Sequence, residues 1–143
     1  MREVQRSAIV PYSPEQMFDL VADVERYPEF LPWCAAARLI ERSNHELRGS
    51  LTMAQGPLQG SFTTRNQLDY PRAMSLELED GPFSDLSGEW QFEPLGDGGC
   101  RISLELRFAF ASRVKDALLG VIFEQSCNKL VDAFVQRAGL VYG

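Results

Sequence analysis

Two hydrophobic periods divide the chain. Between Trp33 and Phe110, apolar residues alternate with polar ones in short runs that glycine, proline and asparagine separate. This alternation is typical of antiparallel β-strands joined by tight turns. From Ser112 to Tyr142, apolar residues instead recur at steps of three and four, which is typical of an amphipathic helix. The sequence therefore predicts a run of strands followed by one long C-terminal helix.

The alternating region predicts six strands, and residues 3–10 predict one more before it. The six are expected around residues 38–41, 47–53, 62–70, 74–78, 86–92 and 102–110. Short turns join neighbouring strands, so we expect an antiparallel sheet with one apolar face. That face requires a cover, and only the C-terminal helix is long enough to provide it.

Two short helices are expected between the first strand and the alternating region. Ser13-Pro14-Glu15-Gln16 forms a capping box with proline at the first helical position. Pro28 is expected to end that helix, and one further helical turn fits between Pro28 and Pro32. The fold class is therefore α+β, with a curved antiparallel sheet wrapped around a long C-terminal helix. Such a wrap can leave a cavity between the helix and the sheet.

The apolar surface of the C-terminal helix changes side near Gly120. Its main stripe consists of Leu119, Phe123, Cys127, Leu130, Phe134, Ala138 and Val141. A second group lies nearly opposite and consists of Val114, Leu118, Val121 and Ile122. Either the helix bends near Gly120, or its first two turns present apolar side chains to another surface. That surface is either the loop after Pro28 or a membrane, with Arg113 and Lys115 placed beside the patch to meet anionic headgroups.

Composition indicates a soluble, cytoplasmic protein. The 143 residues carry a formal net charge of −6, which disfavours general binding to DNA or other nucleic acids. The three cysteines are odd in number and far apart, as suits a reducing compartment. The N-terminus lacks the apolar segment of a secretion signal, and no apolar run is long enough for a membrane span.

Catalytic chemistry is poorly represented in the sequence. His45 is the only histidine and falls in a turn, so neither a zinc site nor an activated cysteine is expected. The glycine run at residues 96–99 lies between two strands, which is typical of a hairpin tip and not of a phosphate-binding loop. An enzyme of the cyclase or hydrolase type would need a buried acid or base, and only Asn66 and Glu89 are polar candidates. We therefore expect no enzyme, no cofactor and no metal.

The interior-facing positions supply candidate residues for binding an apolar ligand. They are Met53, Phe62, Leu76, Trp90, Phe92, Leu104, Phe108, Phe123, Leu130 and Phe134. The pattern alone favours ordinary core packing for this set over the lining of a ligand cavity. The residues expected at the mouth of such a cavity, or in contact with a membrane, are Trp33, Val114, Leu118 and Val121.

A family resemblance rests on seven stretches in a fixed order. They are RSAIVPYS at 6–13, MF at 17–18, YPEFLPWC at 27–34, FTTRN at 62–66, DGPF at 80–83, GEWQFEPL at 88–95 and CRI at 100–102. Together they resemble the bacterial ribosome-association toxin family and, in the YPEFLP element, the related coenzyme-Q-binding proteins. This group belongs to the START-like superfamily, also called polyketide cyclase/dehydrase. The resemblance implies a helix-grip fold and a single ligand-binding domain over residues 1–143.

The resemblance also implies two alternative functions. The first is binding of ubiquinone or another isoprenoid quinone, as a non-catalytic chaperone or carrier that supports respiration. The second is binding of the large ribosomal subunit, as a toxin that blocks translation initiation. Contact with ribosomal RNA would depend on pairing between arginines and phosphates. The arginines expected to contribute are Arg38, Arg42, Arg48 and Arg65.

Overall fold

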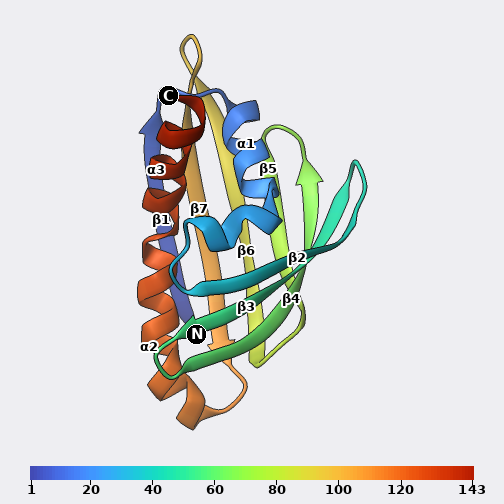
Figure 1. Ribbon diagram of the computed structural model, residues 1–143, viewed down its shortest axis with the longest axis vertical. Helices are drawn as coiled ribbons and strands as arrows, with labels where there is room; N and C mark the ends of the chain where they lie inside the picture. Colours follow the sequence, from blue (N-terminus) through green and yellow to red (C-terminus); the bar gives the residue numbers. More distant parts are fainter.

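The computed structural model describes all residues 1–143 and has one curved sheet with helices on its concave side (Figure 1). The elements are β1 (Arg2–Val10), α1 (Pro14–Ala22), the 3₁₀ helix η1 (Val24–Glu29), β2 (Cys34–Arg42), β3 (Glu46–Gln55), β4 (Leu58–Asp69), β5 (Ala73–Asp80), β6 (Phe83–Leu95), β7 (Gly99–Phe110), α2 (Arg113–Asn128) and α3 (Leu130–Tyr142). All neighbouring strands are antiparallel, in the order β1-β7-β6-β5-β4-β3-β2. The predicted α+β helix-grip fold is confirmed.

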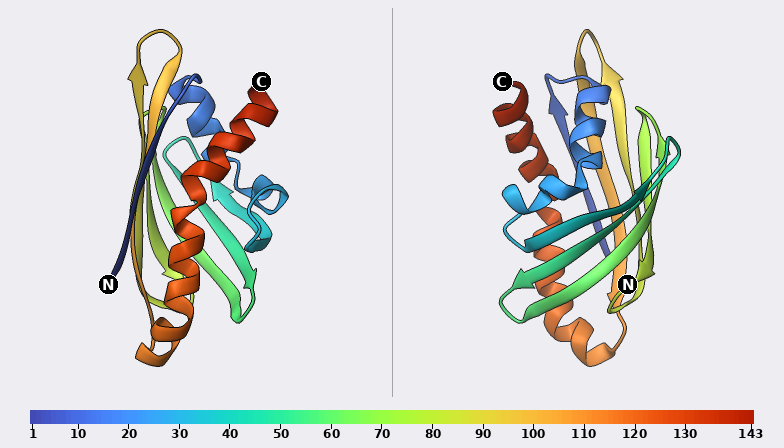
Figure 2. Two further views of the ribbon diagram at one scale, coloured as in Figure 1. Left: turned by 90° about the vertical axis from the view of Figure 1, so that its left-hand side faces the viewer. Right: turned by 45° about the vertical axis from the view of Figure 1, so that its right-hand side comes forward.

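The sheet curves so that its two edges lie on either side of α2 and α3 (Figure 2). The N-terminal strand β1 pairs with β7, while β2 forms the opposite edge. Strand β2 carries two register shifts, between Cys34 and Ala36 and between Leu39 and Glu41. Bulges of this kind bend an edge strand and make it a poor template for further strand pairing.

The helical segment after β1 differs from the sequence prediction in its boundaries. The capping box is present, with Gln16 N–H donating to Ser13 Oγ and Ser13 N–H donating to Gln16 Oε1. However, α1 ends at Ala22, and η1 contains Pro28 instead of following it. Pro28 is the fifth of the six residues of η1, so its missing N–H leaves the last turn of this helix one hydrogen bond short. The expected extra turn between Pro28 and Pro32 is therefore wrong, since the second short helix lies before it.

The C-terminal helix breaks at a different residue from the expected one. It passes through Gly120 without interruption and divides at Lys129 into α2 and α3. The break shifts the buried face, so that Val131 is buried whereas Val141, expected on the apolar stripe, is 51% exposed. The first two turns of α2 are exposed, which agrees with the second of the two alternatives for this helix.

Gly120 has a packing role instead of a bending one. A Cβ atom at this position would overlap the guanidinium of Arg2, which lies directly over the helix. Arg2 donates hydrogen bonds to the Asp116 carbonyl at 3.0 Å and to the Glu124 carboxylate at 3.2 Å. The absence of a side chain at Gly120 therefore allows β1 to hold α2 through one arginine.

Helix α3 is held by the segment around α1 and η1. Arg137 forms an ion pair with Glu29 and lies 5.1 Å from the ring centroid of Phe30, within the range of a cation–π contact. At the C-terminal end, the Tyr142 hydroxyl donates to the Gln16 carbonyl at 2.8 Å. These contacts fix the helix over the sheet and close one side of the interior.

Candidate ligand cavity

An apolar cavity of about 80 Å³ lies between the concave face of the sheet and the C-terminal helices. Of its 18 lining residues, 15 are hydrophobic, so a ligand there would meet an almost dry surface. The lining residues are Val24, Tyr27, Trp33, Leu47, Gly49, Leu51, Phe62, Thr64, Asn66, Leu76, Leu86, Trp90, Leu104, Leu106, Phe123, Cys127, Leu130 and Phe134.

Most of the predicted ligand-binding residues meet at this cavity. Those in the lining are Phe62, Leu76, Trp90, Leu104, Phe123, Leu130 and Phe134, and Trp33 joins them although it was expected at the mouth. Met53, Phe92 and Phe108 are buried elsewhere in the core. Phe92 packs edge-on against Phe18 of α1, with ring centroids 5.5 Å apart. Alternation along a strand shows that a side chain points to the concave face. It does not show whether that side chain packs against α1 or lines the cavity.

Val114, Leu118 and Val121 lie away from the cavity. Their side chains are 70%, 66% and 45% exposed, and none lines the cavity wall. The cavity lies toward the other end of α2 and the start of α3, at Phe123, Cys127 and Leu130. The placement of the three residues at its mouth stays a prediction. A role in membrane contact is independent of this position and stays a prediction.

Sequence reasoning left ten of the lining residues out of the expected ligand-binding set, although it named one of them, Asn66, as a polar candidate for catalysis. The ten are Val24, Tyr27, Leu47, Gly49, Leu51, Thr64, Asn66, Leu86, Leu106 and Cys127. For Leu47, Gly49 and Leu51 the signal was available, because they share the inward parity of Met53 on β3. No sequence signal placed Val24 and Tyr27, since η1 reaches the cavity only through the tertiary fold.

Aromatic rings form the wall beneath α3. The ring of Phe134 lies 5.5 Å from that of Tyr27, 5.1 Å from that of Phe30 and 5.2 Å from that of Trp90, all edge-on. Edge-to-face pairs add to the stabilisation that burial alone gives. The Tyr27 hydroxyl donates to the Val21 carbonyl, and burial raises the pKa of this phenol. This wall is therefore rigid, and its one hydroxyl is already engaged.

Asn66 is the exception on the apolar concave face. It is only 8% exposed and is the one buried polar or charged side chain. Its Nδ2 contacts the Met74 sulfur at 3.5 Å, a weak partner, and its Oδ1 has no hydrogen-bond donor. Glu89, the other polar candidate for catalysis, lies on the convex face, in a hollow with Glu3 and Glu105. The sheet separates the two residues, so they do not form a catalytic pair.

The thiols are buried and kept protonated. Burial raises the pKa of Cys34 to about 11, and it raises the pKa of Cys127 as well. A thiol is nucleophilic only as its thiolate, so neither cysteine is activated near neutral pH. The arrangement of the cavity is therefore suited to holding an apolar molecule and supplies no activated nucleophile.

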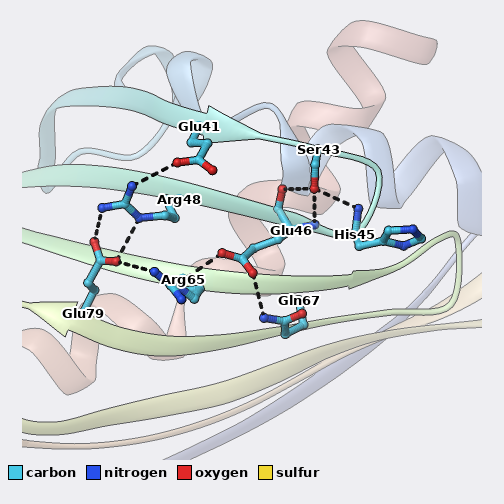
Figure 3. Close-up of polar contacts among 8 residues, drawn as sticks. All are labelled: Glu41, Ser43, His45, Glu46, Arg48, Arg65, Gln67 and Glu79. Atoms are coloured by element: carbon cyan, nitrogen blue, oxygen red, sulfur yellow. Dashed lines mark hydrogen bonds and ion pairs between the residues drawn. The ribbon is translucent and has the colours of Figure 1, made fainter.

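On the convex face, charged side chains pair across four strands (Figure 3). Arg48 meets Glu79 through two hydrogen bonds of 2.8 and 2.7 Å and also contacts Glu41 at 3.2 Å. Arg65 bridges Glu79 and Glu46 at 3.1 and 3.2 Å. The Arg48 hydrogen bond holds the pKa of the Glu79 carboxyl below its usual range. Two of the four arginines expected to contact RNA are thus already paired with carboxylates.

Comparison with known proteins agrees with this geometry. A family model described as polyketide cyclase / dehydrase and lipid transport matches residues 10–135. The chain belongs to this family. A START superfamily protein of Mycobacterium smegmatis has the same fold, with a TM-score of 0.80 at 20% identity over 97% of this chain and 98% of its own. No helix of this family member is both long and apolar enough to cross a membrane.

Two relatives carry functional names. The ribosome association toxin RatA of Pseudomonas aeruginosa is 49% identical over 98% of this chain and 97% of its own length. The mitochondrial coenzyme Q-binding protein COQ10 homolog B of Xenopus laevis is 28% identical over 99% of this chain, which spans 59% of that relative. Neither relative is named as an enzyme. Within the polyketide cyclase and lipid transport family, this chain is thus similar both to ribosome-associated and to quinone-binding proteins.

Proposed function

We propose that this protein binds an apolar ring-bearing lipid, an isoprenoid quinone, without chemically altering it. The observation that carries the proposal is the apolar cavity between the sheet and the C-terminal helices, with 15 hydrophobic residues among its 18 lining residues. The name of the COQ10 relative supports the choice of a quinone. An isoprenoid quinone is nearly insoluble in water, so each Å² of its apolar surface buried in such a cavity contributes about 25 cal/mol.

Ligand entry requires the cavity to widen. At about 80 Å³ it is smaller than the roughly 150 Å³ engineered cavity that admits benzene. The break at Lys129 lies beside it, since Cys127 and Leu130 on either side of the break both line the cavity. A displacement of α2 relative to α3 at this break would enlarge the cavity without disturbing the strand pairing.

Retention of decylubiquinone after gel filtration tests the proposal. The wild-type protein should carry the quinone through the column in a fixed ratio. Leu130→Trp should reduce the retained quinone at least about tenfold, because the larger ring fills the cavity from a partly buried position. Its matched control is Leu140→Trp, which adds the same ring to α3 at a side chain that is 82% exposed.

The control should retain quinone as the wild type does, and both variants should give wild-type circular dichroism. Equal retention by Leu130→Trp and Leu140→Trp would place the quinone outside the cavity and refute the proposed site. No retention by the wild-type protein would refute quinone binding itself.

A second candidate function is association with the large ribosomal subunit. It is favoured by the 49% identity to a relative named as a ribosome association toxin, over nearly the full length of both chains. Arg48 and Arg65 are held by carboxylates, which compete with phosphate for the same guanidinium groups. Arg38 and Arg42 are exposed on the edge strand β2 and belong to no salt bridge of this network. These two are the free cations of the expected set.

Co-sedimentation with purified large subunits tests this second candidate. Changing Arg38 and Arg42 together to serine should reduce pelleting several-fold, because two phosphate contacts are lost. The same change at Arg48 and Arg65 is the control and should leave pelleting nearly unaltered. A wild-type protein that stays in the supernatant at low salt would contradict ribosome association.

A further inference from the structure

One polar side chain in the cavity wall has no satisfactory partner. Asn66 lies on β4 between Leu47 of β3 and Leu76 of β5, and both of these neighbours line the same cavity. Its amide oxygen is fully covered and accepts no hydrogen bond, and its amide nitrogen reaches only the Met74 sulfur. Burial of such a group without a partner is destabilising, and native proteins satisfy most of them.

Asn66 is not needed for packing at this position. An apolar residue of similar size would continue the face formed by Phe62, Leu76 and Leu104, which all line the cavity. It would also remove the unpaired amide from the interior. An amide at this place is therefore useful only when something else supplies its hydrogen-bond partner.

We propose that Asn66 is the polar anchor that binds a ring oxygen of the ligand and selects oxygen-bearing rings over purely apolar ones. The proposal rests on the proposed function and names the chemistry that the cavity recognises. When the cavity widens around a ring, the Asn66 amide donates through Nδ2 to a carbonyl oxygen on the ring, or accepts through Oδ1 from a ring hydroxyl. The aromatic wall holds the apolar part of the same ring.

An amide suits both redox forms of a quinone. The Asn66 amide has a donor and an acceptor on one planar group, and rotation about its Cβ–Cγ bond exchanges them. It can donate to a quinone carbonyl and accept from a quinol hydroxyl. The anchor therefore retains a ring in either redox state, as a carrier requires. A charged side chain would not, because a carboxylate only accepts hydrogen bonds and an ammonium group only donates them.

A matched pair of probes tests the anchor by calorimetric titration. Duroquinone and durene share the same tetramethylated ring, but only duroquinone has the two carbonyl oxygens. Wild-type protein should bind duroquinone about tenfold more tightly than durene, as one added hydrogen bond allows. Asn66→Leu should weaken duroquinone binding by about the same factor and leave durene binding unchanged. Leu68→Met is the control: it is a volume-conserving change on the same strand, at a side chain that does not line the cavity, and it should alter the affinity for neither probe.

The thermal midpoint gives a second, independent readout. Without ligand, Asn66→Leu should raise Tm by a few degrees, since it replaces an unsatisfied buried amide with an apolar side chain. A variant that gains stability yet loses only the oxygen-dependent part of binding identifies an anchor and not a structural residue. If Asn66→Leu does not fold, the infrared carbonyl stretch of duroquinone bound to wild type serves instead and should move to lower frequency.

The outcomes separate this proposal from the proposed function. Equal affinity of the wild type for duroquinone and durene, or a carbonyl stretch unchanged from that in hydrocarbon solvent, would overturn the role of Asn66 and leave the apolar cavity intact. Binding of neither probe would overturn both the anchor and the cavity-binding function.

Discussion

Gly120 allows β1 to hold α2, and this close approach can be measured. Alanine normally stabilises a helix relative to glycine by about 1 kcal/mol. At Gly139 on α3, a Cβ would meet only the Tyr12 hydroxyl at 3.8 Å, an ordinary contact. At Gly120, the same atom displaces Arg2 and breaks its bonds to Asp116 and Glu124.

We therefore predict opposite effects for two identical substitutions. Gly139→Ala should raise the free energy of unfolding by about 0.5–1 kcal/mol. Gly120→Ala should lower it by about 1 kcal/mol, because a part-buried hydrogen-bonded arginine is lost. Urea denaturation of both variants measures the difference. Equal stabilisation by both would show that Arg2 moves aside freely and does not hold α2.

At the residue scale, the sequence showed which side chains point inward but not what they meet there. Phe62, Trp90 and Phe134 line the cavity, whereas Phe92 with the same parity packs under α1. The unsatisfied amide of Asn66 could not be inferred either, because its cost depends on neighbours from other strands. Alternation shows on which face of the sheet a side chain lies. Whether that side chain belongs to the packed core or to the cavity wall depends on tertiary packing.

At the scale of elements, strands and turns were predictable because each carries its own period. All seven strands were expected, although β2 begins at Cys34 and β4 at Leu58, earlier than alternation suggested. The break of the C-terminal helix at Lys129 had no such signal. Neither glycine nor proline marks it, and Gly120, which does carry a signal, lies within an unbroken helix. Both helices contact β1 and β7, but α2 also contacts β4 whereas α3 also contacts α1.

The exposed face of α2 leads to a prediction about membranes. Val114, Leu118 and Val121 form a contiguous apolar patch, and Arg113 and Lys115 beside it favour an anionic surface. Flotation with phosphatidylglycerol vesicles should recover the wild-type protein, and Leu118→Asp should reduce the bound fraction several-fold. The control, Leu140→Asp, changes a leucine on α3 that is even more exposed than Leu118, and this variant should bind as the wild type does. Equal loss in both variants would show that no specific patch is used.

At the scale of the whole molecule, the sheet curves around α2 and α3 (Figure 2), and the cavity lies between the sheet and these helices. Its wall combines η1, five strands and both C-terminal helices, so residues as distant in sequence as Val24 and Phe134 share it. The convex face, by contrast, is closed by paired charges such as Arg48 and Glu79. The molecule therefore has an apolar interior and a charged convex exterior on which Arg48 and Arg65 are paired with carboxylates.

The central claim is that an apolar lipid occupies this interior in the cell. Native mass spectrometry of the protein purified from its own cells, with the bound molecules identified after solvent extraction, tests it most directly. The account predicts an isoprenoid quinone bound to the wild-type protein and missing from Leu130→Trp purified in the same way. Repeated preparations of folded wild-type protein that carry no lipid, or an equal load on both proteins, would contradict it.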